Sequence, residues 1–255
     1  RSIKEPEEIE LLQKACNITE KGVRRLLSFV KPGVWEYEIE AELMHEFLRN
    51  RSRGFAYTPI IASGENANVL HYIANNMQCK DGDVILLDVG AEYANYSSDL
   101  TRMIPVNGKF TARQKEIYNA VLDMKNFATS LLVPGNNWYD YHKECGEFYT
   151  SKFLELGLLD KADIQNQDKN WPAYKKYMMH GTSHHLGLDT HDYGILKDKF
   201  VENMVFTVEP GIYLPAEGFG VRIEDDLVIQ NSGPAFNLMK NIPIEVEEIE
   251  ELMNS

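Results

Sequence analysis

The chain has 255 residues, 44% of them hydrophobic, which suffices for one large domain with its own core, and its formal net charge is −13. Its lysines and arginines form no basic cluster with interleaved aromatic residues, so the composition argues against a nucleic-acid partner. No run of about 18 apolar residues and no signal-peptide pattern occurs, and the cysteines lack a CxxC spacing, so we expect a cytoplasmic protein with free thiols and no membrane span.

The first element expected is a long helix that begins near Pro6. Proline is tolerated in a first helical turn, and Glu7 and Glu8 follow it at the positive end of the helix dipole. The apolar stripe of this helix consists of Ile9, Leu12, Ala15 and Ile18. Pro32 and Gly33 are expected to end the helix.

Helical and extended patterns then alternate. Residues 37–51 predict a second helix, because apolar residues recur on one side of it. Residues 54–72 are expected to form a strand and a loop with His71 at its far end. A turn at Asp81-Gly82 begins the region 80–106, for which we predict three short extended runs in a small meander.

Two further helices are expected before the C-terminal strands. Thr111 and Gln114 have the spacing of a capping box, and the helix that they begin should end at Pro134-Gly135. The next helix runs from about residue 138 to 156, and residues 160–177 are polar and irregular. Turns and strands follow, before an acidic tail at 244–253 that we expect to be a solvated helix. This segregation of helices and strands predicts an α+β domain.

The segment HGTSHHLGLDTHD, residues 180–192, places three imidazoles among small residues. His180 and His184 are four residues apart and could share a helix face, but the neighbouring glycines favour a turn-rich or strand-like path. Two acidic strands follow in the sequence. We therefore interpret His180, His184 and His191 as candidate functional residues.

Four acids occur in two similar patterns. Leu87-Asp88-Val89-Gly90, followed by Asp99, resembles Val208-Glu209-Pro210-Gly211, followed by Glu224. In each pattern an apolar strand ends in a carboxylate, the glycine lets the chain reverse closely, and the returning strand carries the second carboxylate. If the two halves pack about a pseudo-twofold axis, all four carboxylates converge on one face.

Four neighbouring carboxylates require cations among them, because like charges repel strongly where water is scarce. With one imidazole they form a hard, oxygen-rich ligand set, which suits Mn²⁺ or another octahedral divalent ion better than structural zinc. Two such ions could hold a bridging water or hydroxide for attack on an amide carbonyl. The acids therefore predict a dinuclear hydrolytic centre.

Strand alternation predicts which side chains accompany these acids. Residues two apart share a face, so Arg222 should lie beside Glu224, and Thr101 should lie beside the acids of the first half. Both side chains could then orient the carboxylates. An ordinary ion pair from Arg222 to Asp225 or Asp226 is the alternative.

The chain resembles the catalytic domain of the Xaa-Pro aminopeptidases, within the dinuclear pita-bread metallopeptidases that also include prolidase and methionine aminopeptidase. The resemblance rests on LLDVGAEYANYSSDLTR, MHGTSHHLGLDTHD, TVEPGIY and VRIEDDLVI, in the family's order and spacing. It implies a pita-bread fold, with two duplicated halves and a curved, mainly antiparallel sheet covered by helices. It also implies one catalytic domain over residues 1–255, without the N-terminal domain that precedes it in relatives.

The resemblance implies that five side chains of this chain are metal ligands. The ligands would be Asp88, Asp99, His184, Glu209 and Glu224, with Asp99 and Glu224 bridging two divalent ions, expected to be Mn²⁺.

The resemblance also implies roles toward the substrate. His71 would steady the leaving or intermediate groups, His191 would hydrogen-bond the substrate carbonyl or oxyanion, and His180 would line the proline side of the pocket. Glu209 would accept the proton of the bridging water, and Arg222 would support the ligands.

The implied activity is removal of the residue before proline from the N-terminus of a proline-containing peptide, by a protein that is a homo-oligomer at full length. Ser183 in the spelling HxxSHxxGLxxHD favours aminopeptidase P over prolidase, an Xaa-Pro dipeptidase, which remains an alternative. A non-catalytic pita-bread module that binds a protein partner is the alternative from another class. Relatives of that kind typically lose several ligands, and here none is lost.

Overall fold

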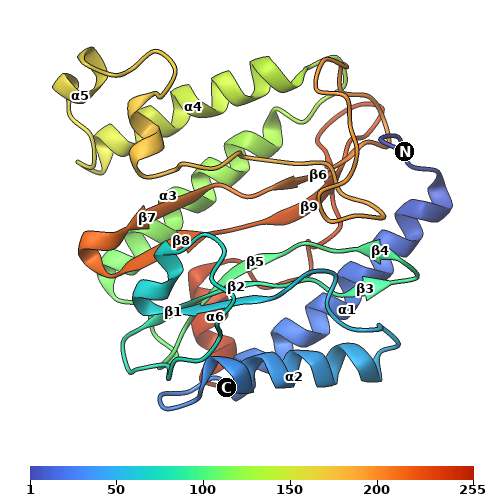
Figure 1. Ribbon diagram of the computed structural model, residues 1–255, viewed down its shortest axis with the longest axis vertical. Helices are drawn as coiled ribbons and strands as arrows, with labels where there is room; N and C mark the ends of the chain where they lie inside the picture. Colours follow the sequence, from blue (N-terminus) through green and yellow to red (C-terminus); the bar gives the residue numbers. More distant parts are fainter.

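The computed structural model describes residues 1–255 as helices around a set of short antiparallel strands (Figure 1). The α-helices are α1 (Pro6–Phe29), α2 (Glu36–Arg49), α3 (Ala112–Ser130), α4 (Trp138–Glu155), α5 (Lys161–Gln165) and α6 (Val246–Met253), and the 3₁₀ turns are η1 (Gly64–Asn68), η2 (Ala173–Lys176) and η3 (Pro215–Glu217). The strands are β1 (Ile60–Ser63), β2 (Val84–Asp88), β3 (Glu92–Tyr93), β4 (Tyr96–Ser97), β5 (Thr101–Pro105), β6 (Val205–Val208), β7 (Gly211–Leu214), β8 (Phe219–Arg222), β9 (Asp225–Val228) and β10 (Phe236–Asn237).

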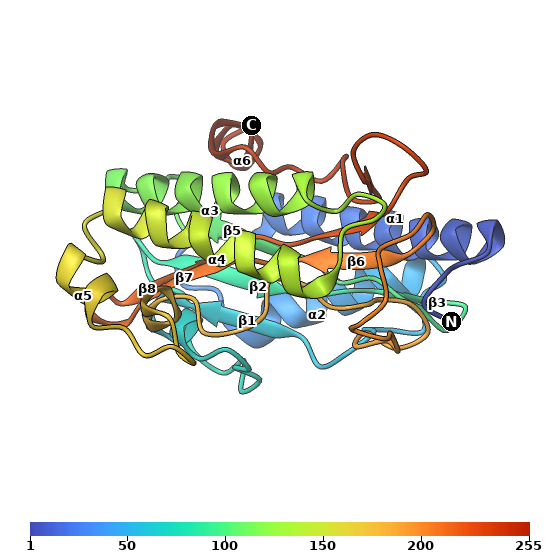
Figure 2. The same ribbon diagram turned by 90° about the horizontal axis from the view of Figure 1, so that it is seen from above.

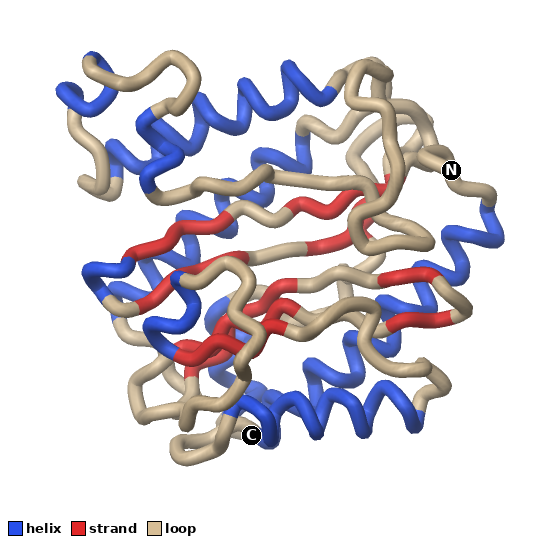
Figure 3. Tube along the Cα trace, in the orientation of Figure 1, coloured by secondary structure: helices blue, strands red, loops and turns tan.

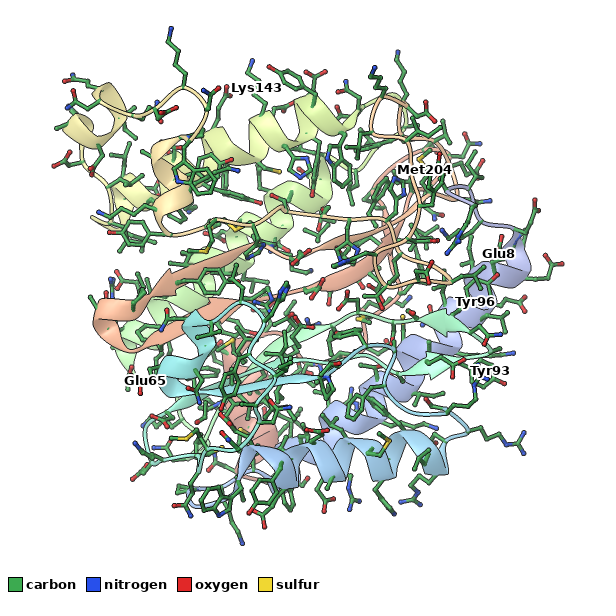
Figure 4. All side chains as sticks on the ribbon, viewed as in Figure 1. Glu8, Glu65, Tyr93, Tyr96, Lys143 and Met204 are labelled. Atoms are coloured by element: carbon green, nitrogen blue, oxygen red, sulfur yellow. The ribbon has the colours of Figure 1, made fainter.

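Helix α1 begins at Pro6 as expected, and its first turn is closed by the Glu8 carboxylate, which accepts a hydrogen bond of 2.8 Å from the backbone N–H of Glu5. It packs closely on α2. At Gly22 a Cβ atom would lie 2.7 Å from the Phe47 ring, so only glycine permits this approach of the two helices. The hydroxyl of Tyr96 donates to Glu8 at 2.7 Å and ties β4 to the same helix (Figure 4).

The capping box predicted at Thr111 is confirmed. Its Oγ1 accepts from the N–H of Gln114 at 3.2 Å, and the Gln114 side chain accepts from the N–H of Thr111 at 2.8 Å. The acidic tail forms the expected helix, α6, but it is solvated on one face only. Val246 and Ile249 are buried in the main core.

Two sequence predictions were too coarse. The region 80–106 contains four strands rather than three extended runs, because the short turn after Glu92-Tyr93 adds the hairpin β3–β4. The segment 160–177 is not irregular throughout, since it contains α5 and η2. The Asp160 carboxylate begins α5 by accepting from the backbone N–H of Asp163 at 2.9 Å.

The strands form two similar antiparallel sheets, β1-β2-β5 and β10-β9-β6, each accompanied by a two-stranded hairpin, β3-β4 or β7-β8. Figure 3 shows these strands gathered in the centre of the molecule. A bridge between Thr101 and Glu224 joins the two halves, and the Glu224 N–H donates to the Thr101 carbonyl at 3.1 Å. The four predicted acids lie around this seam.

Helices α1 and α3 lie along one side of the strands, and α6 lies farther out on that side (Figure 2). Helices α2 and α4 run along opposite edges (Figure 1). The helices and strands enclose one large hydrophobic cluster and a smaller one between α1 and the second half. None of the helices combines the length and the apolar character that crossing a membrane requires. Helices α1 and α3 occupy one side of the strands, and the loops of residues 69–77 and 180–192 lie on the other side (Figure 2).

Candidate metal centre

Each half of the sheet delivers two acids to the seam. Asp88 ends β2 and Asp99 precedes β5, while Glu209 follows β6 and Glu224 lies between β8 and β9. Gly90 allows the first pair to approach, because a Cβ atom there would lie 1.8 Å from the Ser98 carbonyl oxygen. The paired strand ends predicted from the sequence are therefore present in both halves.

The expected ligands gather at the floor of one cavity of about 700 Å³. One ligand atom each from Asp99, His184 and Glu224 lies within 4.8 Å of the other two. The Nε2 atom of His184 is 3.3 Å from Asp99 Oδ2 and 3.7 Å from Glu209 Oε1. Asp88 lines the same cavity, so all five side chains border one space.

The electrostatics of the floor favour bound cations. Burial, together with the charges of Asp99 and Glu209, raises the pKa of Glu224 well above its usual range. Burial also raises the pKa of Glu209 to about 7, against the opposing effects of His184 and Arg222. Burial raises the pKa of Asp88, although Arg222 opposes it. These acids are short of positive charge, which divalent metal ions would supply.

His184 is oriented for coordination through one nitrogen. Its Nδ1 lies 2.9 Å from the carbonyl oxygen of His185, which can only accept, so Nδ1 carries the proton and Nε2 points to the acids. Burial lowers the pKa of His184, but the hydrogen bond and charge of Asp99, together with Glu209, raise it to about 9. A carbonyl on one nitrogen and carboxylates beside the other is an arrangement that fits a metal ligand.

The other three histidines line the walls of the same cavity. The ring centroid of His191 is 4.5 Å from that of His184, and burial lowers the pKa of His191. His71 is exposed on the opposite loop, after η1. His71, His180 and His191 therefore border one pocket, and their roles toward a substrate stay predictions.

His180 belongs to a chain of hydrogen bonds that reaches the first half. Arg222 Nη1 donates to the Tyr213 hydroxyl at 2.8 Å, and this hydroxyl lies 2.7 Å from His180 Nε2. The Gly181 carbonyl, 2.8 Å from His180 Nδ1, can only accept, so Nδ1 carries the proton of the neutral ring and Nε2 accepts from the Tyr213 hydroxyl. Burial, followed by the charge of Arg222, lowers the pKa of His180 to about 3. His180 is therefore a neutral imidazole.

Residues 10–231 match the profile of metallopeptidase family M24. The chain belongs to this family. It is 42% identical to the Xaa-Pro aminopeptidase of Haemophilus influenzae, over 100% of this chain and 61% of that protein, and 40% identical to that of Escherichia coli, over 99% and 59%. The chain thus spans about six tenths of the length of these curated relatives.

Solved structures show the same similarity to M24 proteins. A variant of Escherichia coli aminopeptidase P in complex with substrate matches with a TM-score of 0.92 and 39% identity, over 100% of this chain and 60% of that one. The zinc-substituted Escherichia coli enzyme in complex with product matches with a TM-score of 0.92 and 40% identity, with the same coverage. The pita-bread fold implied by the sequence motifs is therefore confirmed.

Arg222 has a different principal partner from the one predicted. Its Nη2 lies 2.5 Å from Asp88 Oδ2, across the seam, whereas strand alternation placed it beside Glu224. It does reach Glu224 indirectly, since Thr101 accepts from Arg222 Nε at 3.2 Å and donates to Glu224 at 2.7 Å. The alternative ion pair with Asp225 or Asp226 is wrong, because Arg222 pairs with Asp88 and Arg102 pairs with Asp225.

Tyr57 is a residue of this M24 centre that the sequence prediction missed. Its hydroxyl lies 2.6 Å from Asp88 Oδ1 and 2.6 Å from Asp99 Oδ1, so it joins the two acids of the first half. The register Ile60↔Asp88 brings the start of β1 alongside the end of β2. A sequence-based prediction could have placed Tyr57 near Asp88 only by pairing these two segments in the correct register.

The metal-free protein is expected to lose stability as pH rises. The pKa of Glu209 in the folded protein is raised from 4.5 to about 7. Its contribution to the free energy of unfolding is therefore fully present below about pH 4.5 and is lost as pH rises through about 7. His184, raised from 6.5 to about 9, acts in the same direction up to about pH 9. Bound cations would offset the repulsion among the ionised carboxylates of the site at high pH.

Manganese should therefore raise Tm more in alkaline than in mildly acidic buffer. At a free Mn²⁺ concentration about 100-fold above Kd, binding adds about 2.7 kcal/mol. For a chain of this size that is a rise in Tm of about 5–10 °C. Thermal unfolding of chelator-treated protein, with and without Mn²⁺, across this pH range tests the expectation. A Tm indifferent to Mn²⁺ at every pH would contradict it.

Proposed function

We propose that this chain is the catalytic part of an Xaa-Pro aminopeptidase, which hydrolyses the bond between the first residue of a peptide and a following proline. One observation carries the proposal: the five ligand-type side chains all line one cavity, which three further histidines border, and three of the five, Asp99, His184 and Glu224, are close enough together to hold a metal ion. The names of the relatives that match the whole chain support the same activity.

We propose that the acids and His184 hold two divalent ions, Mn²⁺ being the ion that best suits four carboxylates and one imidazole. Asp99 and Glu224 would be the shared ligands, since they come from different halves and each has a ligand atom within 4.8 Å of the other and of His184. When bound, the ions would polarise the scissile carbonyl and supply an activated water for its attack. Tyr57 and Arg222 would keep Asp88 in place through the contacts described above.

The remaining chemistry falls to side chains of the cavity. Glu209, which lines the cavity with an oxygen 3.7 Å from His184 Nε2, is suited by position to accept a proton from the attacking water. His191 and His71 face the cavity as hydrogen-bond donors for the developing oxyanion. The neutral ring of His180 would provide an apolar wall for proline, because its polar edges are already satisfied.

The cavity suits peptides longer than dipeptides. Arg222 is the one lysine or arginine that lines it, and its Nε, Nη1 and Nη2 already bond Thr101, Tyr213 and Asp88. Beyond the proposed metal ions, the C-terminal carboxylate of an Xaa-Pro dipeptide would therefore meet no free cationic side chain, at a cost in binding. This argues for the aminopeptidase and against the prolidase alternative.

Hydrolysis assays with Mn²⁺-loaded protein test the proposal. Xaa-Pro-Yaa tripeptides should release the first residue, and the matched Xaa-Ala-Yaa peptides should not. Xaa-Pro dipeptides should be cleaved at least about tenfold more slowly, the factor for a desolvation cost of about 1.4 kcal/mol. Faster cleavage of the dipeptides would favour a prolidase, and no cleavage of either peptide by a protein that binds two ions would favour a binding module.

We propose in addition that the full-length protein is a cytoplasmic homo-oligomer. Three cysteines, all of them buried as free thiols, support a reducing compartment. Light scattering of the purified full-length protein tests the oligomeric state, and a monomer would contradict this prediction.

A further inference from the structure

The loop that carries His71 borders the cavity without belonging to any helix or strand. Residues 69–77 follow η1, and His71 and Ile73 are exposed to solvent. Leu70, His71 and Ile73 nevertheless line the same cavity as the ligands. If His71 is to contact a substrate at a fixed distance, other residues must fix the conformation of this loop.

Glu36, the first residue of α2, lies beneath the loop and is fully buried. Its Oε1 accepts hydrogen bonds from the Ser63 N–H at 2.9 Å and from Asn66 Nδ2 at 3.0 Å. Its Oε2 accepts from the Tyr72 hydroxyl at 2.7 Å and from the Met77 N–H at 2.9 Å. A carboxylate has about four acceptor sites, and here all four donors come from residues 63–77.

No arginine, lysine or histidine forms an ion pair with Glu36. Its charge is held by hydrogen bonds alone, and a buried charge without its donors is very costly. The four donors also span both ends of the loop, since Ser63 and Asn66 precede His71 and Met77 follows it. Loop and carboxylate therefore fix each other, and opening the loop would expose a carboxylate with no other partner.

A second set of hydrogen bonds, made by Asn75, holds the loop to α2 and to β1. Asn75 is buried, with a positive φ of 42°, and its Oδ1 accepts from the Ile61 N–H at 3.0 Å. Its Nδ2 donates to the Pro59 carbonyl and to Glu40 Oε2, both at 3.0 Å. The loop thus returns to β1 and α2 after passing the cavity.

We propose that Glu36 is a positioning residue for His71: through Tyr72, the next residue in the chain, it holds the imidazole at the wall of the cavity where the substrate binds. The inference deepens the proposed function and rests on it for the contact between His71 and the substrate. Glu36 itself does not line the cavity, so it would act on the reaction only through the loop.

Because Glu36 only accepts in all four contacts, an isosteric substitution can test them. In Glu36→Gln the amide NH₂ would face two donors, so at least two of the four hydrogen bonds are lost although the volume is unchanged. Glu36→Asp keeps the charge on a shorter side chain and should rescue part of the loss. Tyr72→Phe removes one donor only. Glu38→Gln is the matched control, because Glu38 accepts a single bond from the Trp35 N–H, which glutamine also accepts.

The first measurement is hydrogen exchange, which does not depend on activity. Protection of residues 64–77 should fall about tenfold or more in Glu36→Gln, less in Glu36→Asp and in Tyr72→Phe, and not in Glu38→Gln. Protection of β2 and β6, and the metal content, should not change. Unchanged protection of the loop in Glu36→Gln would overturn the proposal.

The second measurement is a double-mutant cycle in kcat/KM for an Xaa-Pro-Yaa peptide. Glu36→Gln should lower kcat by about 10–100-fold with little change in KM, and adding it to His71→Ala should cost almost nothing further. Full additivity of the two substitutions would overturn the proposal. If the parent protein cleaves no Xaa-Pro peptide, the proposed function fails, and the exchange data still decide whether Glu36 anchors the loop.

Discussion

Asp99→Asn is expected to leave the protein folded but without measurable turnover of Xaa-Pro peptides. Asparagine keeps the size of the side chain and can still hydrogen-bond Tyr57. It removes the one carboxylate that lies within 4.8 Å of ligand atoms of both His184 and Glu224. Removing a single electrostatic contact to a transition state already costs about 10²–10³-fold, and a shared metal ligand should cost at least as much.

Elemental mass spectrometry together with steady-state kinetics measures this effect. The variant should purify with fewer ions per chain than the parent, and kcat should fall by at least about 10³-fold. Asp189→Asn is the matched control, because Asp189 also lines the cavity but is exposed on its rim and pairs with Arg1. Retained activity in Asp99→Asn would contradict both the ligand assignment and the hydrolytic mechanism.

Arg102→Met is expected to destabilise the protein strongly. Arg102 is almost fully buried behind the metal centre, where it lies 2.5 Å from Asp225 and donates to the Glu224 carbonyl at 2.7 Å and the Pro243 carbonyl at 3.0 Å. Burial alone would raise the pKa of Asp225, but Arg102 and Lys125 lower it to about 2. The substitution leaves this charge with one cation and strips two carbonyls of their donor.

Breaking a buried ion pair in this way typically costs about 3–5 kcal/mol. At about 2–4 °C per kcal/mol, Tm should fall by roughly 6–20 °C. Thermal or urea unfolding of the metal-free protein measures the change without interference from bound ions. Arg113→Met is the control, since its partners Glu217 and Glu116 are half-buried to exposed, and an ion pair of that kind contributes less than about 1 kcal/mol. Equal Tm values for the two variants would refute the prediction.

The residues that the sequence located correctly share one property, which is that a local pattern marks them. Asp88 ends the apolar strand β2 and Glu209 directly follows the apolar strand β6, each close to a glycine, and the repeat of this pattern predicted that the acids lie near one another. The helices were predictable for the same reason, from periodicity and capping. Thr111 is an example, where the capping pair lies three residues apart.

The interactions that were missed all depend on register between distant segments. Alternation along β8 gave the face of Arg222 correctly, but alternation cannot tell which strand lies opposite, and the principal partner proved to be Asp88. Tyr57 reaches the same acid from before β1, and Arg102 crosses to the backbone of Glu224. Such contacts follow from how two halves dock, which is set by the whole core rather than by any short stretch.

The Thr101–Glu224 bridge has a consequence for biosynthesis. The cluster of Asp99, His184 and Glu224 draws on residues separated by about half of the chain, and Glu224 is placed in it by pairing with Thr101. A nascent polypeptide cannot assemble this cluster before Glu224 has left the ribosome and the two sheets have met. Capture of a cation at the full site is therefore a late event in maturation, and it reports that the whole duplicated scaffold has closed.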